Sequence, residues 1–294
     1  MQTTQTQAPA PMREALAFLT ITYSLAVALT LGLPHSDINV PLTALLPTVA
    51  VSVVTFTMFR RGTRRALWAS IGLNKTGAHS WGAALGIPIL LCGSAFGAAL
   101  LVGAGHLRVL NITAATLTDF AVNSLLNFLI MLVILMGEEI GWRGFLLPRV
   151  QQLTTKRRPA LLTGLAHGCF HLPLILIATT YNTEGSRWIA APTTVFTITA
   201  AGVFYAWLKD RSGSVWPVAI GHTFANTTFG WGFTAIASTT PTSLALVAGE
   251  TGIATLAAVA LMAVFLLATA KEWKTPGTVD TASDDSTHAM SEAH

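Results

Sequence analysis

The chain has 294 residues, of which 52% are hydrophobic and only 10% are charged. A soluble globular protein carries about 25% charged residues, so this composition excludes an ordinary soluble domain and indicates that most of the chain faces lipid. The formal net charge of +4 would suit nucleic-acid binding, but most of the basic residues are confined to short stretches between apolar runs.

Apolar runs of about 20 residues, the length that a helix needs to cross a bilayer, recur along the whole chain. Eight such runs are present, at residues 14–33, 39–59, 80–104, 119–146, 159–180, 188–208, 214–236 and 249–270. They predict an all-α fold, a polytopic membrane bundle of about eight transmembrane helices. The seventh run is the least apolar because it is rich in Gly and Thr, and the fourth is long enough to tilt or to extend beyond the bilayer.

Lysine and arginine residues gather in alternate loops. They follow the second, fourth, sixth and eighth runs, at Arg60, Arg61, Arg64, Arg65, Lys75, Arg149, Lys156, Arg157, Arg158, Lys209, Arg211, Lys271 and Lys274. The opposite loops contain only Arg108 and Arg187. Because cytoplasmic loops carry the Lys/Arg excess, we expect a multi-pass protein of the cell membrane with both termini in the cytoplasm. This topology accounts for the positive charge, so no nucleic-acid partner is expected.

The two ends of the chain differ in composition from the apolar middle. Residues 1–13 and residues 271–294 are polar, and the latter are mixed in charge, so both predict disordered segments, the second a cytoplasmic tail. Residues 14–270 form the predicted transmembrane bundle.

Ionisable residues inside predicted membrane helices are costly in lipid and therefore mark candidate functional sites. The sequence GEEIGWRGFLLPR, residues 137–149, brings Glu138, Glu139 and Arg143 to the end of the fourth run. Glu139 and Arg143 are four residues apart and share a helical face, whereas Glu138 points about 100° away from Glu139. One carboxylate can therefore pair with the arginine while the other faces a cavity.

Two further helices carry polar residues at a spacing of one turn. These are His167 and His171 in the fifth run, and His222 and Asn226 in the seventh. Counted from the basic ends of their helices, Glu138, His171 and His222 lie at depths of about 16, 18 and 12 Å. Acid, imidazole and amide groups thus meet in one layer. There a carboxylate can take a proton from water that an imidazole helps to hold, and imidazole and amide groups can stabilise an oxyanion.

Two other functions fit parts of this pattern. A single His or Asn in a membrane helix often bonds a neighbouring helix, so a non-catalytic scaffold is one alternative. A transporter with a buried proton or substrate relay is the other. The transporter is disfavoured because no carboxylate apart from Glu138 and Glu139 lies deep in a predicted helix, which leaves a path across the bilayer without stepping stones.

The same residues resemble the motifs of the CPBP intramembrane metalloprotease family, also called the CAAX protease and bacteriocin-processing or Abi family. Three motifs of that family, EExxxR, FxxxH and HxxxN, match Glu138–Arg143, His171 and His222–Asn226. The resemblance spans about residues 119–236, the predicted peptidase core. One departure concerns the second motif, in which His167 occupies the position of the phenylalanine.

The resemblance implies an intramembrane endopeptidase that uses water activated by glutamate and histidine, with a CAAX-type or a bacteriocin-type substrate. The implied catalytic residues are Glu138, His171, His222 and Asn226, and the residues that support the site are Glu139, Arg143 and His167. Glu138 would activate water with His171, while His222 and Asn226 would stabilise the oxyanion. The expected partners are a membrane protein or peptide substrate and the lipid bilayer.

The family name implies a metal, but the glutamate chemistry can proceed without one. A catalytic zinc ion usually has three protein ligands and one open position. Glu138, His171 and His222 can supply such a set, so a zinc enzyme is the alternative, with His167 as an additional imidazole. We expect that no cofactor is required.

The predicted topology can be tested with reporter fusions. A reporter fused after Lys274 or within residues 151–158 is expected to lie in the cytoplasm, because these segments adjoin basic residues. One fused within residues 181–187 is expected on the other side. A reversed pattern would contradict the eight-helix topology and the depths inferred from it.

Overall fold

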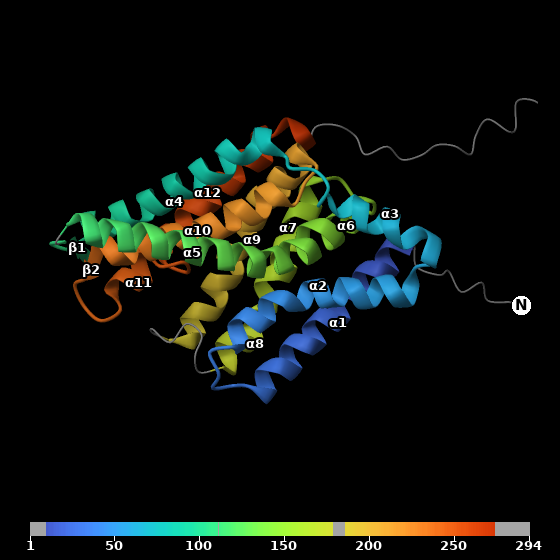
Figure 1. Ribbon diagram of the computed structural model, residues 1–294, viewed down its shortest axis with the longest axis horizontal. Coiled ribbons are helices and arrows are strands. Elements are labelled where there is room, and N and C mark those ends of the chain that lie inside the picture. Colours follow the sequence, from blue (N-terminus) through green and yellow to red (C-terminus); the bar gives the residue numbers. More distant parts are fainter. Residues whose placement is uncertain (1–9, 111, 179–185, 274–294) are drawn as a thin grey trace, which may run out of the picture.

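Helices make up most of the chain in the computed structural model, which describes residues 10–110, 112–178 and 186–273 (Figure 1). The long helices are α1 (Ala10–Gly32), α2 (Asn39–Met58), α4 (Trp81–Leu101), α5 (Ala114–Glu139), α7 (Arg157–Phe170), α9 (Arg187–Ser212), α10 (Trp216–Ala235) and α12 (Ile253–Thr269). The short helices are α3 (Arg61–Ile71), α6 (Leu147–Gln151), α8 (Leu172–Leu176), α11 (Ser243–Ala248) and two 3-10 turns, Ala78–Ser80 and Lys271–Trp273. Two strands, β1 (Gly105–Leu107) and β2 (Ile236–Ser238), form an antiparallel pair with Gly105 opposite Ser238. The predicted all-α polytopic bundle is confirmed, with this small ribbon as an addition.

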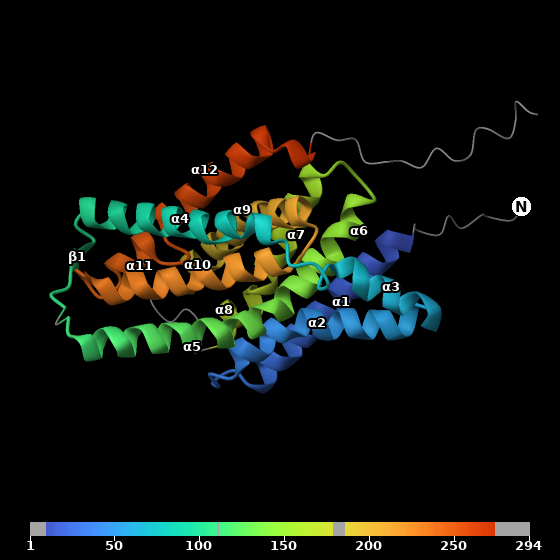
Figure 2. The same ribbon diagram turned by 45° about the horizontal axis from the view of Figure 1, so that its top comes forward.

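Seven helical segments of the described chain are long and apolar enough to cross a membrane, and each overlaps a predicted run. The remaining run, 214–236, is helical as α10 but is not among the seven, because its Gly, Thr, His and Asn residues make it less apolar. α10 packs against α4, α5 and α9 within the bundle, so little of its surface needs to suit lipid (Figure 2).

The helical region extends slightly beyond the predicted limits. α1 begins at Ala10, and the 3-10 turn after α12 buries Trp273. The predicted disorder of residues 1–9 and 274–294 falls outside the described residues, as do residues 181–185 of the predicted outer loop.

Most of the basic loops lie at one end of the bundle, which also holds both ends of the described chain (Figures 1 and 2). Arg149 of α6 pairs with Glu14 of α1 at 2.9 Å. Gln151 at the end of α6 and Trp273 after α12 both donate hydrogen bonds of 3.0 Å to Asp210 near the end of α9. The start of α1 is thereby joined to α6 directly, and the turn after α12 is joined to α6 through Asp210. This agrees with an even number of passes, and the side of the membrane that this end faces stays a prediction.

One face of α5 is apolar and unburied, whereas its last turn is enclosed by the bundle. Leu125, Ile130 and Val133 are 59%, 60% and 71% exposed, as is expected for side chains in contact with lipid tails. Glu138 and Glu139, only a few residues later, are buried. The lipid-facing helix thus delivers its two carboxylates into the protein interior.

Small residues allow α7 and α9 to approach closely beside this polar layer. A Cβ atom added to Gly164 would lie 2.6 Å from the carbonyl oxygen of Thr199, and one added to Gly168 would lie 2.8 Å from that of Val195. Close backbone contact through small residues is a common means of helix association in membranes. His167 lies between the two glycines in the sequence, so this contact holds its imidazole inside the bundle.

The helix that carries the two glutamates changes type directly after them. Residues Ile140–Leu146 form a π-helix between α5 and α6. Such wide turns are rare and recur at functional sites. Trp142 and Arg143 lie in this segment, are fully buried, and both contact His167 of α7.

Candidate active site

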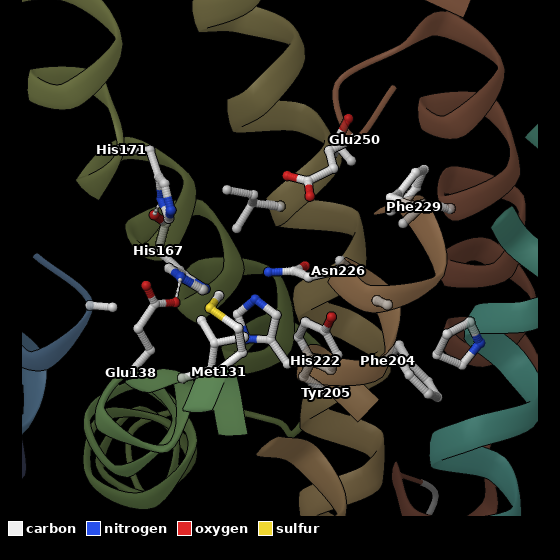
Figure 3. A pocket seen from close by; sticks show the side chains of 18 of the residues that line it. Met131, Glu138, His167, His171, Phe204, Tyr205, His222, Asn226, Phe229 and Glu250 are labelled. Atoms are coloured by element: carbon white, nitrogen blue, oxygen red, sulfur yellow. Dashed lines mark hydrogen bonds and ion pairs between the residues drawn. The ribbon is translucent and has the colours of Figure 1, made fainter. Parts of the chain in front are cut away.

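The predicted polar residues surround a cavity of about 510 Å³ in the interior of the bundle. Its walls come from α2, α4, α5, α7, α9, α10 and α12, and most of its lining is apolar. Glu138, His167, His171, His222 and Asn226 all contribute to the lining (Figure 3). The structure therefore brings together the acid, imidazole and amide groups that the depth argument placed in one layer.

Glu138 is held by His167 rather than by His171. Its Oε2 atom lies 2.8 Å from Nε2 of His167, and both side chains are buried. The other ring nitrogen of His167, Nδ1, lies 3.0 Å from Nη1 of Arg143. A guanidinium group can only donate, so Nδ1 accepts and the proton of neutral His167 resides on Nε2, which donates to Glu138. Arg143 thereby selects the tautomer that holds the carboxylate.

Glu139 connects Arg143 to His222. Its carboxylate accepts hydrogen bonds of 3.1 and 3.2 Å from Nη1 of Arg143, with both side chains fully buried. Its Oε1 atom also lies 2.8 Å from Nδ1 of His222. An ionised carboxylate only accepts, so Nδ1 of His222 donates and its Nε2 edge is available to the cavity. The predicted division of the two glutamates, one paired with Arg143 and one facing a cavity, agrees with this geometry.

His171 and Asn226 complete the group. Nδ1 of His171 lies 3.1 Å from the carbonyl oxygen of His167, which accepts from it, so Nε2 is the acceptor nitrogen of the neutral ring. Figure 3 shows the side chain of Asn226 extending into the cavity with its amide end toward the histidines. His222 and Asn226 are one turn apart on α10, so both reach the cavity from the same face.

Two aromatic residues that sequence reasoning did not select hold the imidazoles. Trp142 stacks on His167, with ring centroids 5.0 Å apart and an angle of 24° between the planes. Tyr205 of α9 stacks on His222 at 5.1 Å and 29°, and its ring also lies 4.9 Å from the guanidinium carbon of Arg143. Tyr205 is one of only three tyrosines in the chain and falls in a predicted membrane run, which is a signal that a search for polar groups in helices can use.

A third carboxylate lines the same cavity. Glu250 lies between α11 and α12, and Figure 3 shows its carboxylate directed into the cavity, on the side of His171 and Asn226. Glu250 lies in an exposed turn and not deep in a helix, so it adds a carboxylate to the cavity without contradicting the expectation that only Glu138 and Glu139 lie deep in a predicted helix. Glu250 was not predicted from the sequence as a site residue because it lies at the edge of the predicted run 249–270, where a carboxylate resembles an ordinary loop residue.

The geometry favours a different metal-ligand set from the predicted one. Ligand atoms of Glu138, His167 and His171 lie within 4.8 Å of one another, and the predicted ligand His222 is not part of this group. To ligate a metal through Nε2, neutral His167 would carry its proton on Nδ1, which would then face the Nη1 donor of Arg143 at 3.0 Å. Two donors facing each other lose a buried hydrogen bond. The hydrogen bonds around His167 thus do not fit a metal ion at this group.

Comparison with known families identifies the class of protein. Residues 120–228 match the family model for type II CAAX prenyl endopeptidase Rce1-like proteins. Together with its membrane helices, this match makes the chain a membrane-embedded protease, which is a hydrolase. This segment is similar to the Rce1-like CAAX endopeptidases, in agreement with the predicted CPBP resemblance. The comparison with curated proteins gave no match. The matched segment contains every predicted site residue and ends before Glu250.

The ion pair of Glu139 leads to a prediction on stability. Replacing Glu139 with Gln leaves Arg143 without an anionic partner. The Nε and Nη2 atoms of Arg143 already lack hydrogen-bond partners among the described residues, so they cannot compensate for the loss. Breaking a buried pair costs about 3–5 kcal/mol, so the purified Glu139→Gln protein is expected to unfold at a clearly lower temperature.

The matched control is Glu272→Gln, which breaks the more exposed pair with Arg211. Surface pairs contribute at most about 1 kcal/mol, so this variant is expected to melt close to the wild type. Equal melting temperatures for Glu139→Gln and the wild type would show that the Glu139–Arg143 pair does not support the fold.

Proposed function

We propose that the chain is an intramembrane endopeptidase in which Glu138 activates the water that attacks a peptide bond of a membrane-associated substrate. The observation that carries this proposal is the pairing of Glu138. One carboxylate oxygen accepts a hydrogen bond from His167, while the other has no hydrogen bond among the described residues and the residue lines the cavity. A general base needs this arrangement, because one oxygen must be oriented while the other takes the proton.

His171 would hold the attacking water together with Glu138. A nitrogen of His171 and a carboxylate oxygen of Glu138 lie within 4.8 Å of each other. One water molecule can bridge such a gap, since each of its hydrogen bonds spans about 2.8 Å. The water then donates one proton to Glu138 and the other toward Nε2 of His171, which leaves a lone pair on its oxygen for the attack.

His222 and Asn226 would stabilise the oxyanion. Glu138, Glu139 and Arg143 together carry one excess negative charge, which a proton on His222 neutralises. His222 then donates to Glu139 through Nδ1 and to the oxyanion through Nε2, beside the amide of Asn226. Such oriented donors in a water-poor site are worth about 3–4 kcal/mol each in the transition state.

The reaction balances without a further reagent. As the water oxygen bonds to the carbonyl carbon, its proton passes to Glu138 and the carbonyl electrons move onto oxygen. When the intermediate collapses, the carbon–nitrogen bond breaks and Glu138 returns the proton to the departing amine. Glu139 and Arg143 take no part in these transfers, and they orient His222 and His167 respectively.

The surroundings of the site suggest the kind of substrate. The cavity of about 510 Å³ is lined mainly by apolar side chains such as Leu135, Leu174 and Phe229, which suit a short apolar peptide segment or a lipid chain attached to one. Prenylated CAAX proteins and bacteriocin-like peptides are the two candidate substrate classes. We place the enzyme in the cell membrane with both termini in the cytoplasm, on the basis of its basic loops.

Replacing Glu138 with Gln tests the proposed base. The amide keeps the shape of the side chain but cannot take a proton, so cleavage is expected to fall by a factor of about 10²–10⁴. The measurement is quantitative proteomics of membranes from cells that produce the wild-type or the variant protein, with new peptide ends as the readout. Normal yield and melting temperature of Glu138→Gln would exclude misfolding. The appearance of the same new ends with both proteins would contradict the proposal.

Metal removal tests the choice of chemistry. Because Arg143 and Glu138 both engage His167, we propose a glutamate peptidase that needs no metal. Cleavage by the purified protein is therefore expected to persist after metal-free purification and incubation with a chelator. One equivalent of zinc in the purified protein, lost together with activity in Glu138→Gln and in His171→Ala, would contradict this choice.

A further inference from the structure

Glu250 lies where the catalytic cavity meets a second pocket of the bundle. It lines the catalytic cavity, and it also lines a second pocket of about 480 Å³ between the start of α9, the end of α10 and α11. Asn226 and Phe229 border both spaces as well. The second pocket thus continues the catalytic cavity beyond Asn226. A substrate peptide that extends from the catalytic residues along α10 would pass Glu250.

The carboxylate of Glu250 has no cationic partner in the part of the chain that the structure describes. It makes no ion pair or hydrogen bond there, whereas Glu138 and Glu139 are each held by a basic or imidazole side chain. A structural role as a cap of α12 would require a hydrogen bond to the first turn of that helix, and none is formed. The side chain of Glu250 is exposed and borders both pockets, so its charge is available to a cationic group of a ligand that enters them.

We propose that Glu250 forms a binding subsite for a lysine or arginine side chain of the peptide substrate. The inference rests on the proposed peptidase function and adds to it the charge of the substrate. Glu250 lies outside the segment that matches the family model, so this preference belongs to the C-terminal part of this chain. The same carboxylate would repel an acidic group in this position.

The geometry also indicates how far from the cleaved bond the basic residue lies. Asn226 and Phe229, which border the same two pockets as Glu250, follow His222 by about 6 and 10.5 Å along α10 at 1.5 Å per residue. An extended peptide advances about 3.3–3.6 Å per residue. The basic residue is therefore expected about two or three residues from the bond that is cleaved.

Peptide binding to an inactive protein tests the subsite without cleavage. In the Glu138→Gln background, the full chain in a neutral detergent is titrated with acetyl-Leu-Leu-Lys-Leu-Leu-amide and with its norleucine analogue. A hydrogen-bonded charge pair contributes about 1.5–3 kcal/mol, so the lysine peptide is expected to bind about tenfold tighter or more. With Glu250→Gln added, the two dissociation constants should become equal within about twofold, and with Glu250→Lys the order should reverse.

The matched control is Asp119→Asn, which removes a carboxylate from the exposed start of α5 outside both pockets. It should keep the full preference for lysine. The subsite would be overturned if the protein with Glu250 intact bound both peptides equally, or did not bind the lysine peptide at millimolar concentration. It would also be overturned if Glu250→Gln kept the preference for lysine, or if Asp119→Asn lost it to the same extent.

Cleavage specificity gives a second readout. A proteome-derived peptide library digested by the protein with Glu138 intact should show Lys or Arg enriched at one position near the cut, less so with Glu250→Gln. Glu250→Lys should replace this enrichment by Asp or Glu. An identical profile for all three proteins would overturn the subsite while leaving the peptidase function in place. If the lysine peptide binds more tightly but no cleavage depends on Glu138, the peptidase function is overturned while the subsite remains.

Discussion

The structure depends on how two adjacent buried carboxylates each obtain their own partner and their own role. Glu138 and Glu139 lie next to each other in a region from which water is largely absent, where each charge must find a partner. Arg143 solves this problem for both. Its Nη1 atom binds the carboxylate of Glu139 directly and fixes His167, whose other nitrogen holds Glu138. A single guanidinium thus compensates one carboxylate by charge and the other through a neutral imidazole.

The packing of the bundle serves this arrangement. The π-helix after α5 carries Trp142 and Arg143 against His167, and the close contact of α7 with α9 presses His167 into the interior from the other side. Tyr205 then lies between Arg143 and His222 as an aromatic layer that contacts both. Because lipid offers no water to unsatisfied groups, the polar side chains of this layer bond largely to one another, and the contacts of His167 with Glu138 and of His222 with Glu139 join different helices.

His167 gives the site a character that its motif alone would not suggest. In the resembling family this position is occupied by phenylalanine, which can stack but cannot form hydrogen bonds. In this chain the imidazole still stacks on Trp142, and in addition it links Arg143 to Glu138. The base is therefore oriented by a group that is itself oriented, while its second oxygen is left for water. A preference for a basic substrate residue at Glu250 would extend the same principle, in which each carboxylate has its own partner.

The sequence by itself determined the class of fold, the positions of most helices and the pairing of Glu139 with Arg143. Apolar runs and the four-residue spacing act locally, so they can be read without knowledge of the neighbours. The sequence also indicated that acid, imidazole and amide groups share one layer. It did not reveal which imidazole holds Glu138, nor that His222 binds Glu139 and that Tyr205 and Glu250 face the cavity. These contacts join α5, α7, α9, α10 and the loop before α12, and only tertiary packing decides the rotation of each helix about its axis and the direction of a loop side chain.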